Sequence, residues 1–203
     1  MATKKVGFAA LLAVAVGLTA ATYVVQAPTK KLDAFCNSTE PYVELETPLY
    51  VLLYDTANKG PIHIQYTVEA HELKPEGAPR TGTFWYPDCS EQMPSREAFR
   101  NGYDRGHLIA DRLSDNSPYR DWAWFMGAIT PMHYRLNRGP FAALEGVIYN
   151  EAKTRPVSVK IVLVYSKPMV PDEYIVEADG LGMFVFPNKD PGTKKLEEFR
   201  WQR

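Results

Sequence analysis

Residues Gly102–His107 have the sequence GYDRGH. It places a carboxylate, a guanidinium and an imidazole within a few positions of one another. Taken alone, an Asp-Arg-Gly-His run is a weak signal. An Asp104–Arg105 ion pair beside a turn glycine, followed by a surface His107, explains it equally well. What it means therefore depends on the residues that follow.

A second stretch, Leu136–Glu145, has the sequence LNRGPFAALE. On a regular helix, Asn137 and Glu145 would be offset by about 80° and about 12 Å along the axis, too far apart to chelate one ion together. A hydrated Mg²⁺ resolves this, because it keeps most of its waters and needs few protein oxygens. Asn137 could supply one oxygen while Glu145 holds the water shell. The simpler alternatives are a helix N-cap for Asn137 and an exposed carboxylate for Glu145.

Together the two stretches resemble the DNA/RNA non-specific endonuclease family. Its pattern is Gly-Tyr-Asp-Arg-Gly-His, then Asn-x-x-Pro-Gln, then an asparagine and, eight residues later, a glutamate. This chain has Gly102–His107, Ile129–Pro131, and Asn137 and Glu145 at that spacing, and Phe184–Asn188 is similar to the family's late strand. The resemblance implies an α+β, ββα-metal nuclease fold, a mixed or antiparallel sheet core flanked by helices.

The chain departs from the family at several positions. Ala128 and Met132 stand where asparagine and glutamine are common, and Phe141 stands where tryptophan is usual. Tyr149 occupies a position, one turn after the glutamate, that often carries arginine. We expect these differences to affect substrate positioning and rate more than the type of reaction.

The resemblance implies that His107 is the general base, and an imidazole suits that task near neutral pH. Arg105 can hold a non-bridging phosphate oxygen as the new bond forms. Asn137 would bind Mg²⁺, with Mn²⁺ as an alternative, and Glu145 would act through a metal-bound water. Asp104 is expected to orient or neutralise Arg105. His107 is expected to lie outside the core.

Local charge supports contact with a nucleic-acid backbone. The net charge is −1, but the segment from Arg96 to Arg138 contains seven arginines and no lysine. Arginine suits bidentate phosphate contacts, and Arg135 and Arg138 are predicted, with Arg105, to bind substrate. The same segment holds five acidic residues, so some arginines must be paired internally. Contacts to phosphates alone carry no sequence readout, and both DNA and RNA are expected substrates.

The N-terminus predicts export. Lys4 and Lys5 precede the apolar run Val6–Val25, and residues 1–27 are typical of a signal peptide or a membrane anchor. Cleavage after Ala21 is plausible, and either alternative leaves a nuclease domain at 28–203 that is secreted, periplasmic or anchored facing outward. Contact with a membrane is expected only through an uncleaved N-terminal segment. The sequence identifies no inhibitor protein.

Only two cysteines are present, Cys36 and Cys89. An even pair in an exported domain predicts one disulfide, and two free buried thiols are the alternative. The spacing does not suggest a zinc site, because no Cys-x-x-Cys pair occurs.

The chain pattern predicts mixed α and β structure. Residues Pro28–Thr47 suggest an irregular segment, Pro140–Ala152 a helix that begins with proline, and Lys194–Gln202 a terminal helix. Pro156–Ser166 is apolar and β-branched, which indicates a central strand covered on both faces. Further expected elements are strands at Leu49–Tyr54, Ile62–Glu69 and Met183–Phe186, helical spacing over Pro118–Met126, and a strand or packing patch at Phe84–Tyr86.

Two other functions fit parts of the sequence. One is a catalytically inactive, nuclease-like binding protein outside the membrane. The other is a phosphodiesterase acting on small nucleotides. The presence of His107, Arg105 and Asn137 together favours the enzyme over the binding protein.

Overall fold

The structure is a computed structural model that describes residues 28–76, 78–79, 82–87 and 89–202. The N-terminal signal or anchor expected at 1–27 lies outside the described residues. Among the helices of the described part, none has the length and apolarity needed to cross a bilayer.

A six-stranded antiparallel sheet forms the centre of the molecule, with strand order β1-β2-β3-β6-β7-β8. Its strands are β1 (Tyr42–Glu46), β2 (Val51–Asp55), β3 (Gly60–Val68), β6 (Val157–Val164), β7 (Glu173–Ala178) and β8 (Gly182–Pro187). The strands expected at 49–54, 62–69 and 183–186 are thus present as β2, β3 and β8. The antiparallel core agrees with the fold class predicted from the sequence.

The sheet is covered on one face. In β3 the buried residues Ile64, Tyr66 and Val68 alternate with more exposed neighbours, as the sequence predicts. The expectation that β6 is covered on both faces is wrong. β6 alternates strictly between buried and less buried residues, and Val162 and Val164 remain 41% and 43% exposed. β-branched residues favour strands in general, so they do not reveal how many faces are covered.

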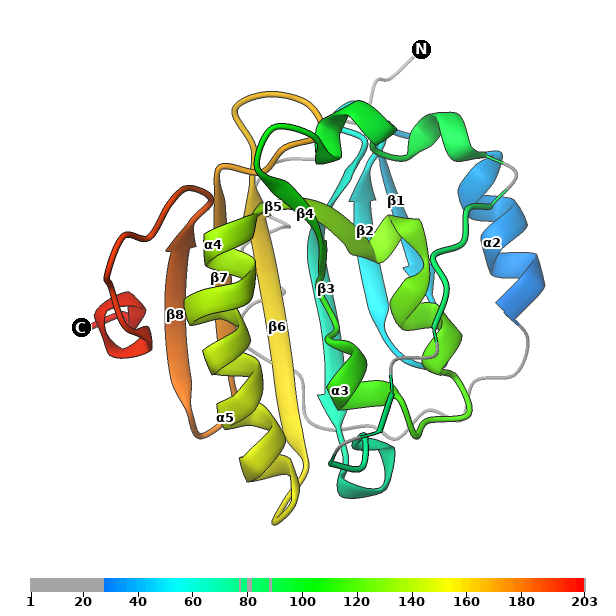
Figure 1. Cartoon of the computed structure of the whole chain (residues 1–203). Coiled ribbons are helices and arrows are strands. Elements are labelled where there is room, and N and C mark those ends of the chain that lie inside the picture. The colour runs from blue at the N-terminus through cyan, green and yellow to red at the C-terminus, as the bar shows by residue number, and fades with distance from the viewer. Residues whose placement is uncertain (1–27, 77, 80–81, 88, 203) are drawn as a thin grey trace, which may run out of the picture.

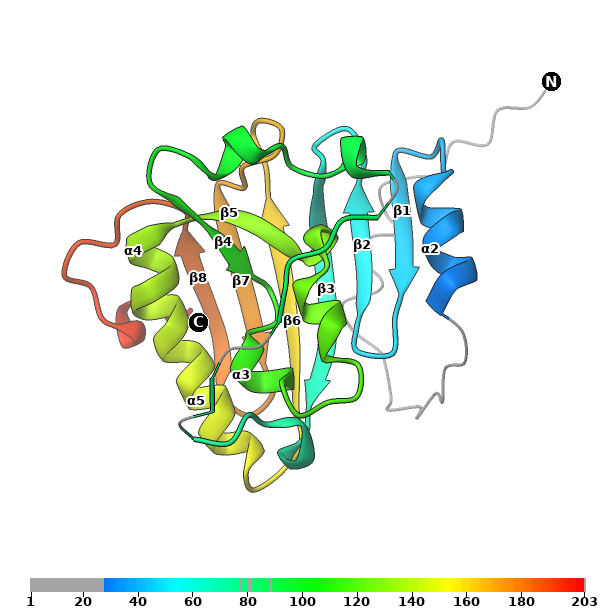
Figure 2. The same ribbon diagram turned by 45° about the vertical axis from the view of Figure 1, so that its right-hand side comes forward.

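The covered face carries a two-stranded hairpin and the main helix. The hairpin pairs β4 (Tyr103–His107) with β5 (Ile129–His133), and the helix is α5 (Ala142–Ala152). Both views place the hairpin, α5 and the short α3 (Asp111–Ser114) in front of the sheet (Figures 1 and 2). The hairpin is fixed to β7 through Tyr174, whose hydroxyl lies 3.0 Å from the Thr130 hydroxyl.

The remaining helices are short. They are α2 (Pro28–Cys36) and α4 (Tyr134–Leu136), with 3-10 helices at Ala70–Glu72, Ser90–Gln92, Arg96–Phe99, Arg120–Trp124, Met126–Ala128 and Leu196–Phe199. The expected irregular segment at 28–47 is therefore wrong, since it contains α2 and β1. The terminal helix expected at 194–202 is only the single 3-10 turn. β1 was not expected because it is stabilised by its pairing with β2, which no local sequence pattern reveals.

A π-helical turn, Asn137–Phe141, precedes α5. Within it Gly139 has φ −112° and ψ −113°, which interrupts the helix. Pro140 follows, and a proline has no N–H to continue the helical hydrogen bonds. The regular-helix geometry assumed for Asn137 and Glu145 consequently does not apply.

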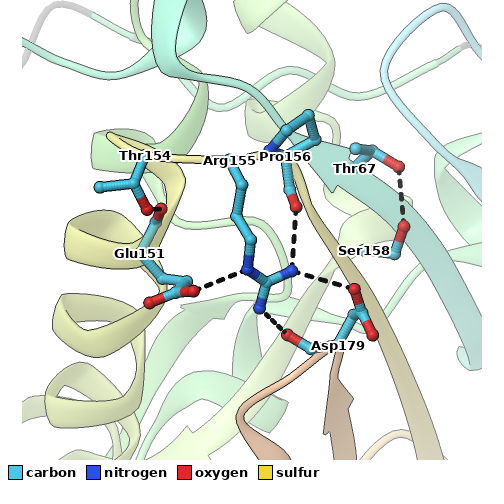
Figure 3. A network of polar contacts seen from close by, with 7 residues as sticks. All are labelled: Thr67, Glu151, Thr154, Arg155, Pro156, Ser158 and Asp179. Carbon is cyan, nitrogen blue, oxygen red and sulfur yellow. Dashed lines mark hydrogen bonds and ion pairs between the residues drawn. The ribbon is translucent and has the colours of Figure 1, made fainter.

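The C-terminal end of α5 is tied to the sheet by Arg155 (Figure 3). Its Nε donates to Glu151 on α5 at 2.6 Å, and its Nη2 donates to the Asp179 carbonyl at 2.7 Å. A side chain at Gly180 would collide with this guanidinium, and Gly180 has φ +72°, a conformation that favours glycine. These contacts hold α5 in place over the sheet.

Cys36 and Cys89 form a disulfide, as predicted from the sequence. It links α2 to the loop before β4. Phe35 at the end of α2 packs edge-on against Tyr54 and Phe125, at 5.3 and 6.2 Å between ring centroids. The bond therefore joins two segments that already share the core.

Candidate active site

The side chains of the Gly102–His107 stretch project to two opposite sides of strand β4. Alternate residues of a strand project to the same side, so Arg105 and His107 point one way and Asp104 the other. Phe84 contacts both members of the first pair, at 5.0 Å from the Arg105 guanidinium carbon and 5.2 Å from the His107 ring. Between them, a Cβ on Gly106 would lie 2.6 Å from the Met132 Cβ, so the tight β4–β5 packing requires glycine there.

His107 is clamped by aromatic rings. Its imidazole meets Trp124 edge-on at 4.7 Å, and Phe84 in turn contacts Trp124 at 4.9 Å. The residue is 8% exposed, so the expectation that it lies outside the core is wrong. From the sequence, Phe84 was predicted only to belong to a strand or packing patch, and no pattern linked it to His107. The clamp fixes the direction of the ring, which a general base needs.

Arg105 is exposed and lies over two rings, Phe84 and, at 5.8 Å, Phe99. In the described part of the chain, no carboxylate lies within ion-pair distance of its guanidinium. The expected pairing of Asp104 with Arg105 is wrong, because neighbouring strand residues project to opposite sides. Arg105 is thus supported by two aromatic rings and remains accessible to solvent.

Asp104 instead joins the two sequence stretches. Its carboxylate accepts hydrogen bonds from Arg138 Nε at 2.8 Å and Nη2 at 2.7 Å, and from the Asn137 amide nitrogen at 3.0 Å. The Arg138 guanidinium holds the pKa of the Asp104 carboxyl below its usual range, and the Asn137 amide adds to this effect. β4 is thereby locked to the π-helical turn.

The orientation of Asn137 fits a hard cation. Because the amide nitrogen is used by Asp104, the amide oxygen is the atom that can face an ion. The N-cap alternative is not what the structure has: Asn137 lies at the C-terminal end of α4, and its side chain bonds to Asp104. No group of three or more His, Cys, Asp or Glu residues suited to a metal occurs among the described residues. The donor set suits an ion that keeps most of its own waters.

Glu145 lies on α5 at a cavity of about 350 Å³. Ala110 and Asp111, which closely follow His107 in the chain, line the same cavity. Burial, together with the nearby Glu145 charge, raises the pKa of Tyr66 beneath it. Glu145 is half-buried, so its carboxylate can reach the cavity while α5 stays packed on the sheet.

Arg135 and Arg138 are exposed, but each has a carboxylate partner. Arg135 Nη1 donates to Asp190 at 2.7 Å, and Arg138 binds Asp104 as described. Both line a groove of about 840 Å³ together with Lys194 and Lys195. His133, at the end of β5, is a rival to His107 as the candidate base, and its Nδ1 accepts a hydrogen bond from the Arg135 backbone N–H.

Three departures from the family pattern are explained by packing. Ala128 and Met132 are fully buried, and Phe141 packs on Tyr174 and Phe186 at 5.7 and 5.4 Å. At these three positions the chain therefore has apolar side chains that belong to its core. Tyr149 is 7% exposed and belongs to the wall of the Glu145 cavity.

An α+β core in which an antiparallel sheet carries a two-stranded hairpin and a helix on one face is the fold of ββα-metal nucleases. The sequence model of the DNA/RNA non-specific endonucleases matches residues 31–175, more than half of the chain. The chain belongs to this family.

Similarity in structure agrees with that assignment. A chain of the crystal structure of the EndoG/EndoGI complex, which concerns the mechanism of EndoG inhibition, has a TM-score of 0.61 and 19% sequence identity. The match covers 78% of this chain and 80% of that chain. A comparison with curated proteins finds no match. At this identity the structural likeness establishes the fold, and the family establishes a nuclease that acts on phosphodiester bonds.

Proposed function

We propose that this protein hydrolyses DNA and RNA without sequence specificity, with His107 as the general base and a hydrated Mg²⁺ held by Asn137. The observation that carries the proposal is the Asp104 carboxylate, which binds Asn137 and Arg138 and so fixes the amide oxygen of Asn137 relative to β4. Family members generally depend on a divalent metal, and the donor set suits Mg²⁺ or Mn²⁺.

His107 would take the proton from the attacking water. Phe84 and Trp124 contact its ring, and these contacts limit the orientations that the imidazole can take. A positioned base typically contributes about 10²–10⁴-fold to the rate. His107 therefore acts as base through orientation as well as basicity.

Arg105 would contact a non-bridging oxygen of the scissile phosphate. It projects on the same side of β4 as His107. Within the described residues it has no ion-pair partner that a bound substrate would have to displace. A charge-assisted contact made to the reacting group strengthens as negative charge develops there.

Asn137 would hold the metal directly and Glu145 would hold one of its waters. Mg²⁺ bound there supplies charge stabilisation for the leaving 3′ oxygen and an acidic water to protonate it. Asp104 is a positioning residue, because it acts by holding Asn137 and Arg138. Arg138 and Arg135 are proposed to contact the substrate backbone farther along the groove. Each guanidinium would then bind both the substrate and its aspartate, which is Asp104 for Arg138 and Asp190 for Arg135.

We also propose that the domain is exported, on the basis of the basic and apolar character of residues 1–27. The disulfide supports this proposal, since such bonds persist in oxidising compartments. The EndoG/EndoGI complex concerns inhibition of a protein with a similar fold, so a protein inhibitor is a partner class to test for.

The test is to incubate the purified protein with supercoiled plasmid and with RNA, in Mg²⁺ or in EDTA. We expect nicking, linearisation and then fragmentation of the plasmid, and degradation of the RNA, in Mg²⁺ only. Binding of both nucleic acids without cleavage, in Mg²⁺ and in Mn²⁺, would instead identify an inactive binding protein. Hydrolysis of small nucleotides with both polymers intact would identify a phosphodiesterase.

A further inference from the structure

The cavity at Glu145 contains an arginine that the proposed mechanism does not use. The cavity lies between the start of α3, residues Lys74–Glu76 and α5. Arg112 enters it from α3, while Glu145 and Tyr149 enter it from α5. A cation thus faces the same space as the proposed holder of the metal's water shell.

Arg112 is held in place by α5. Its guanidinium carbon lies 5.0 Å from the centre of the Tyr149 ring. A Cβ on Gly146 would lie 3.6 Å from Arg112 Nη1, so the guanidinium lies across this part of the helix. Stacking on an aromatic face leaves the edge of a guanidinium, with its N–H donors, open to an anion.

The Tyr149 ring is a rigid support. It is buried, and its hydroxyl donates to the Lys74 carbonyl at 2.8 Å. The Lys74 N–H in turn donates to the Arg112 carbonyl at 3.0 Å. Backbone and side chain of Arg112 are therefore tied to the same short segment, although the side chain itself is exposed.

Of the two described cations that line the cavity, Lys74 is paired with acidic residues and Arg112 is not. Asp111 is paired with Lys74 at 2.8 Å, and Glu76 is paired with Lys153 at 3.2 Å. In the described residues, no carboxylate lies within ion-pair distance of Arg112. The Arg112 guanidinium is therefore available to bind an anion at the cavity.

We propose that Arg112 binds a backbone phosphate adjacent to the scissile one. The inference rests on the proposed function, because it assumes that the cut occurs beside Glu145. Tyr149 lies one helical turn beyond Glu145, about 6 Å along the axis, which places Arg112 past the reacting phosphate. A contact to a phosphate oxygen adds affinity for any sequence, in keeping with non-specific cleavage.

Binding is measured first, in the His107→Ala background with Mg²⁺ and a single-stranded oligonucleotide that remains uncut. Adding Arg112→Ala should weaken binding by about 10- to 100-fold, the usual loss for one charged hydrogen bond. The slope of log affinity against log salt should fall by about 0.7, the value for one phosphate contact on a single strand. Adding Lys160→Ala, from the opposite face of the sheet, should change neither quantity.

A second guanidinium gives a positive test. Tyr149→Arg, added to the Arg112→Ala protein, places an arginine in the same cavity and should restore much of the affinity and the salt slope. Melting curves check that each variant is folded. If Arg112→Ala does not fold, Arg112→Lys replaces it, and we expect weaker binding with an unchanged salt slope. Unchanged affinity and slope in a folded Arg112 variant would overturn the proposal.

Kinetics separate a neighbouring phosphate from the reacting one. In the otherwise wild-type enzyme, Arg112→Ala should raise KM and leave kcat within about twofold, since a contact kept from ground state to transition state affects KM. A loss in kcat with KM unchanged would contradict the neighbouring-phosphate assignment. If the wild type cuts no polymer at all, the proposed function fails, whatever the binding measurements give.

Discussion

Asp104 and Arg138 form a two-point ion pair, with Nε and Nη2 of the guanidinium 2.8 and 2.7 Å from the two carboxylate oxygens. The two residues come from different sequence stretches, one on β4 and one on the π-helical turn before α5. Their pairing is what brings Asn137 against β4. The stability of the candidate metal site should therefore depend on one carboxylate.

Asp104→Asn tests that dependence through pH. The pKa of Asp104 is lowered from its ordinary 3.8 in the folded chain, so the charged form stabilises folding at pH values above 3.8. This contribution is lost as the pH falls through the lowered folded pKa. We expect the variant to melt below wild type at pH 5–7, and the difference to shrink steadily below pH 3.8.

Asp121→Asn is the matched control, because the Asp121 side chain is 84% exposed and touches Arg120 only at 4.0 Å. Its melting temperature should follow wild type at every pH. A constant difference between Asp104→Asn and wild type down to pH 2 would exclude the carboxylate as the cause.

Much of the fold could be predicted from the sequence, and the errors have physical causes. The Gly102–His107 stretch and the strict alternation over 62–69 identified the nuclease fold and β3. β1 was missed because a strand at the sheet edge is stabilised by its partner, β2, rather than by its own pattern. α2 was missed because the contacts that hold it, Phe35 on Tyr54 and Phe125 and the disulfide at Cys36, join segments that are remote in the sequence.

The partners of the site residues were harder to predict than their identities. Arg138 lies 34 residues from Asp104 in the chain, whereas Arg105 is adjacent, so sequence proximity suggested the wrong pair. Placing the motif on a strand would have excluded the adjacent pair, since neighbours point to opposite sides. No local signal connects Phe84 to His107 or Arg112 to Tyr149, because both contacts join remote segments.

His107→Ala should reduce DNA cleavage by about 10²–10⁴-fold if the imidazole is the base. Because the ring is buried between Phe84 and Trp124, the variant should also melt earlier. His107→Phe separates the two effects: it fills the space and should recover stability without activity. His133→Ala, at the rival histidine, should cut nearly normally. Near-normal cleavage of plasmid by His107→Phe would refute the assignment of the base.

Asn137→Ala should lose activity through weaker Mg²⁺ binding, and raising the Mg²⁺ concentration should recover part of it. Glu145→Gln should have a smaller effect, because Glu145 acts through water; outer contacts of this kind typically contribute about 10- to 100-fold in metal affinity or activity. The measurement is initial rate against Mg²⁺ concentration for each variant. If Asn137→Ala only lowers the melting temperature, with the Mg²⁺ dependence unchanged, its role is to bind Asp104 and not a metal.

Residues 1–27 should direct the protein out of the cytoplasm. Expressed in a bacterial host, the full chain should appear in the exported or membrane fraction, while a chain lacking residues 1–27 should remain in the cytoplasm. Intact mass distinguishes the two alternatives. Loss of about the first 21 residues means a cleaved signal, and full length means a retained anchor. Recovery of the full chain in the cytoplasm would disprove export.

The Cys36–Cys89 bond should contribute stability and leave the chemistry unchanged. It closes a loop with a sequence separation of 53, worth about 4 kcal/mol in the chain-entropy model. For a domain of this size, that corresponds to a fall in melting temperature of about 8–16 °C on reduction. Neither cysteine belongs to the stretch that carries Asn137 and Glu145, so the Mg²⁺ dependence of cleavage should stay the same for enzyme that remains folded. The double variant Cys36→Ser/Cys89→Ser is the control: it should melt at the temperature of the reduced wild type and should not respond to reductant.

Non-reducing mass spectrometry of protein from the exported fraction gives the redox state of Cys36 and Cys89 directly. Two free thiols there, or a melting temperature insensitive to reductant, would show that the bond does not stabilise the protein in its own compartment.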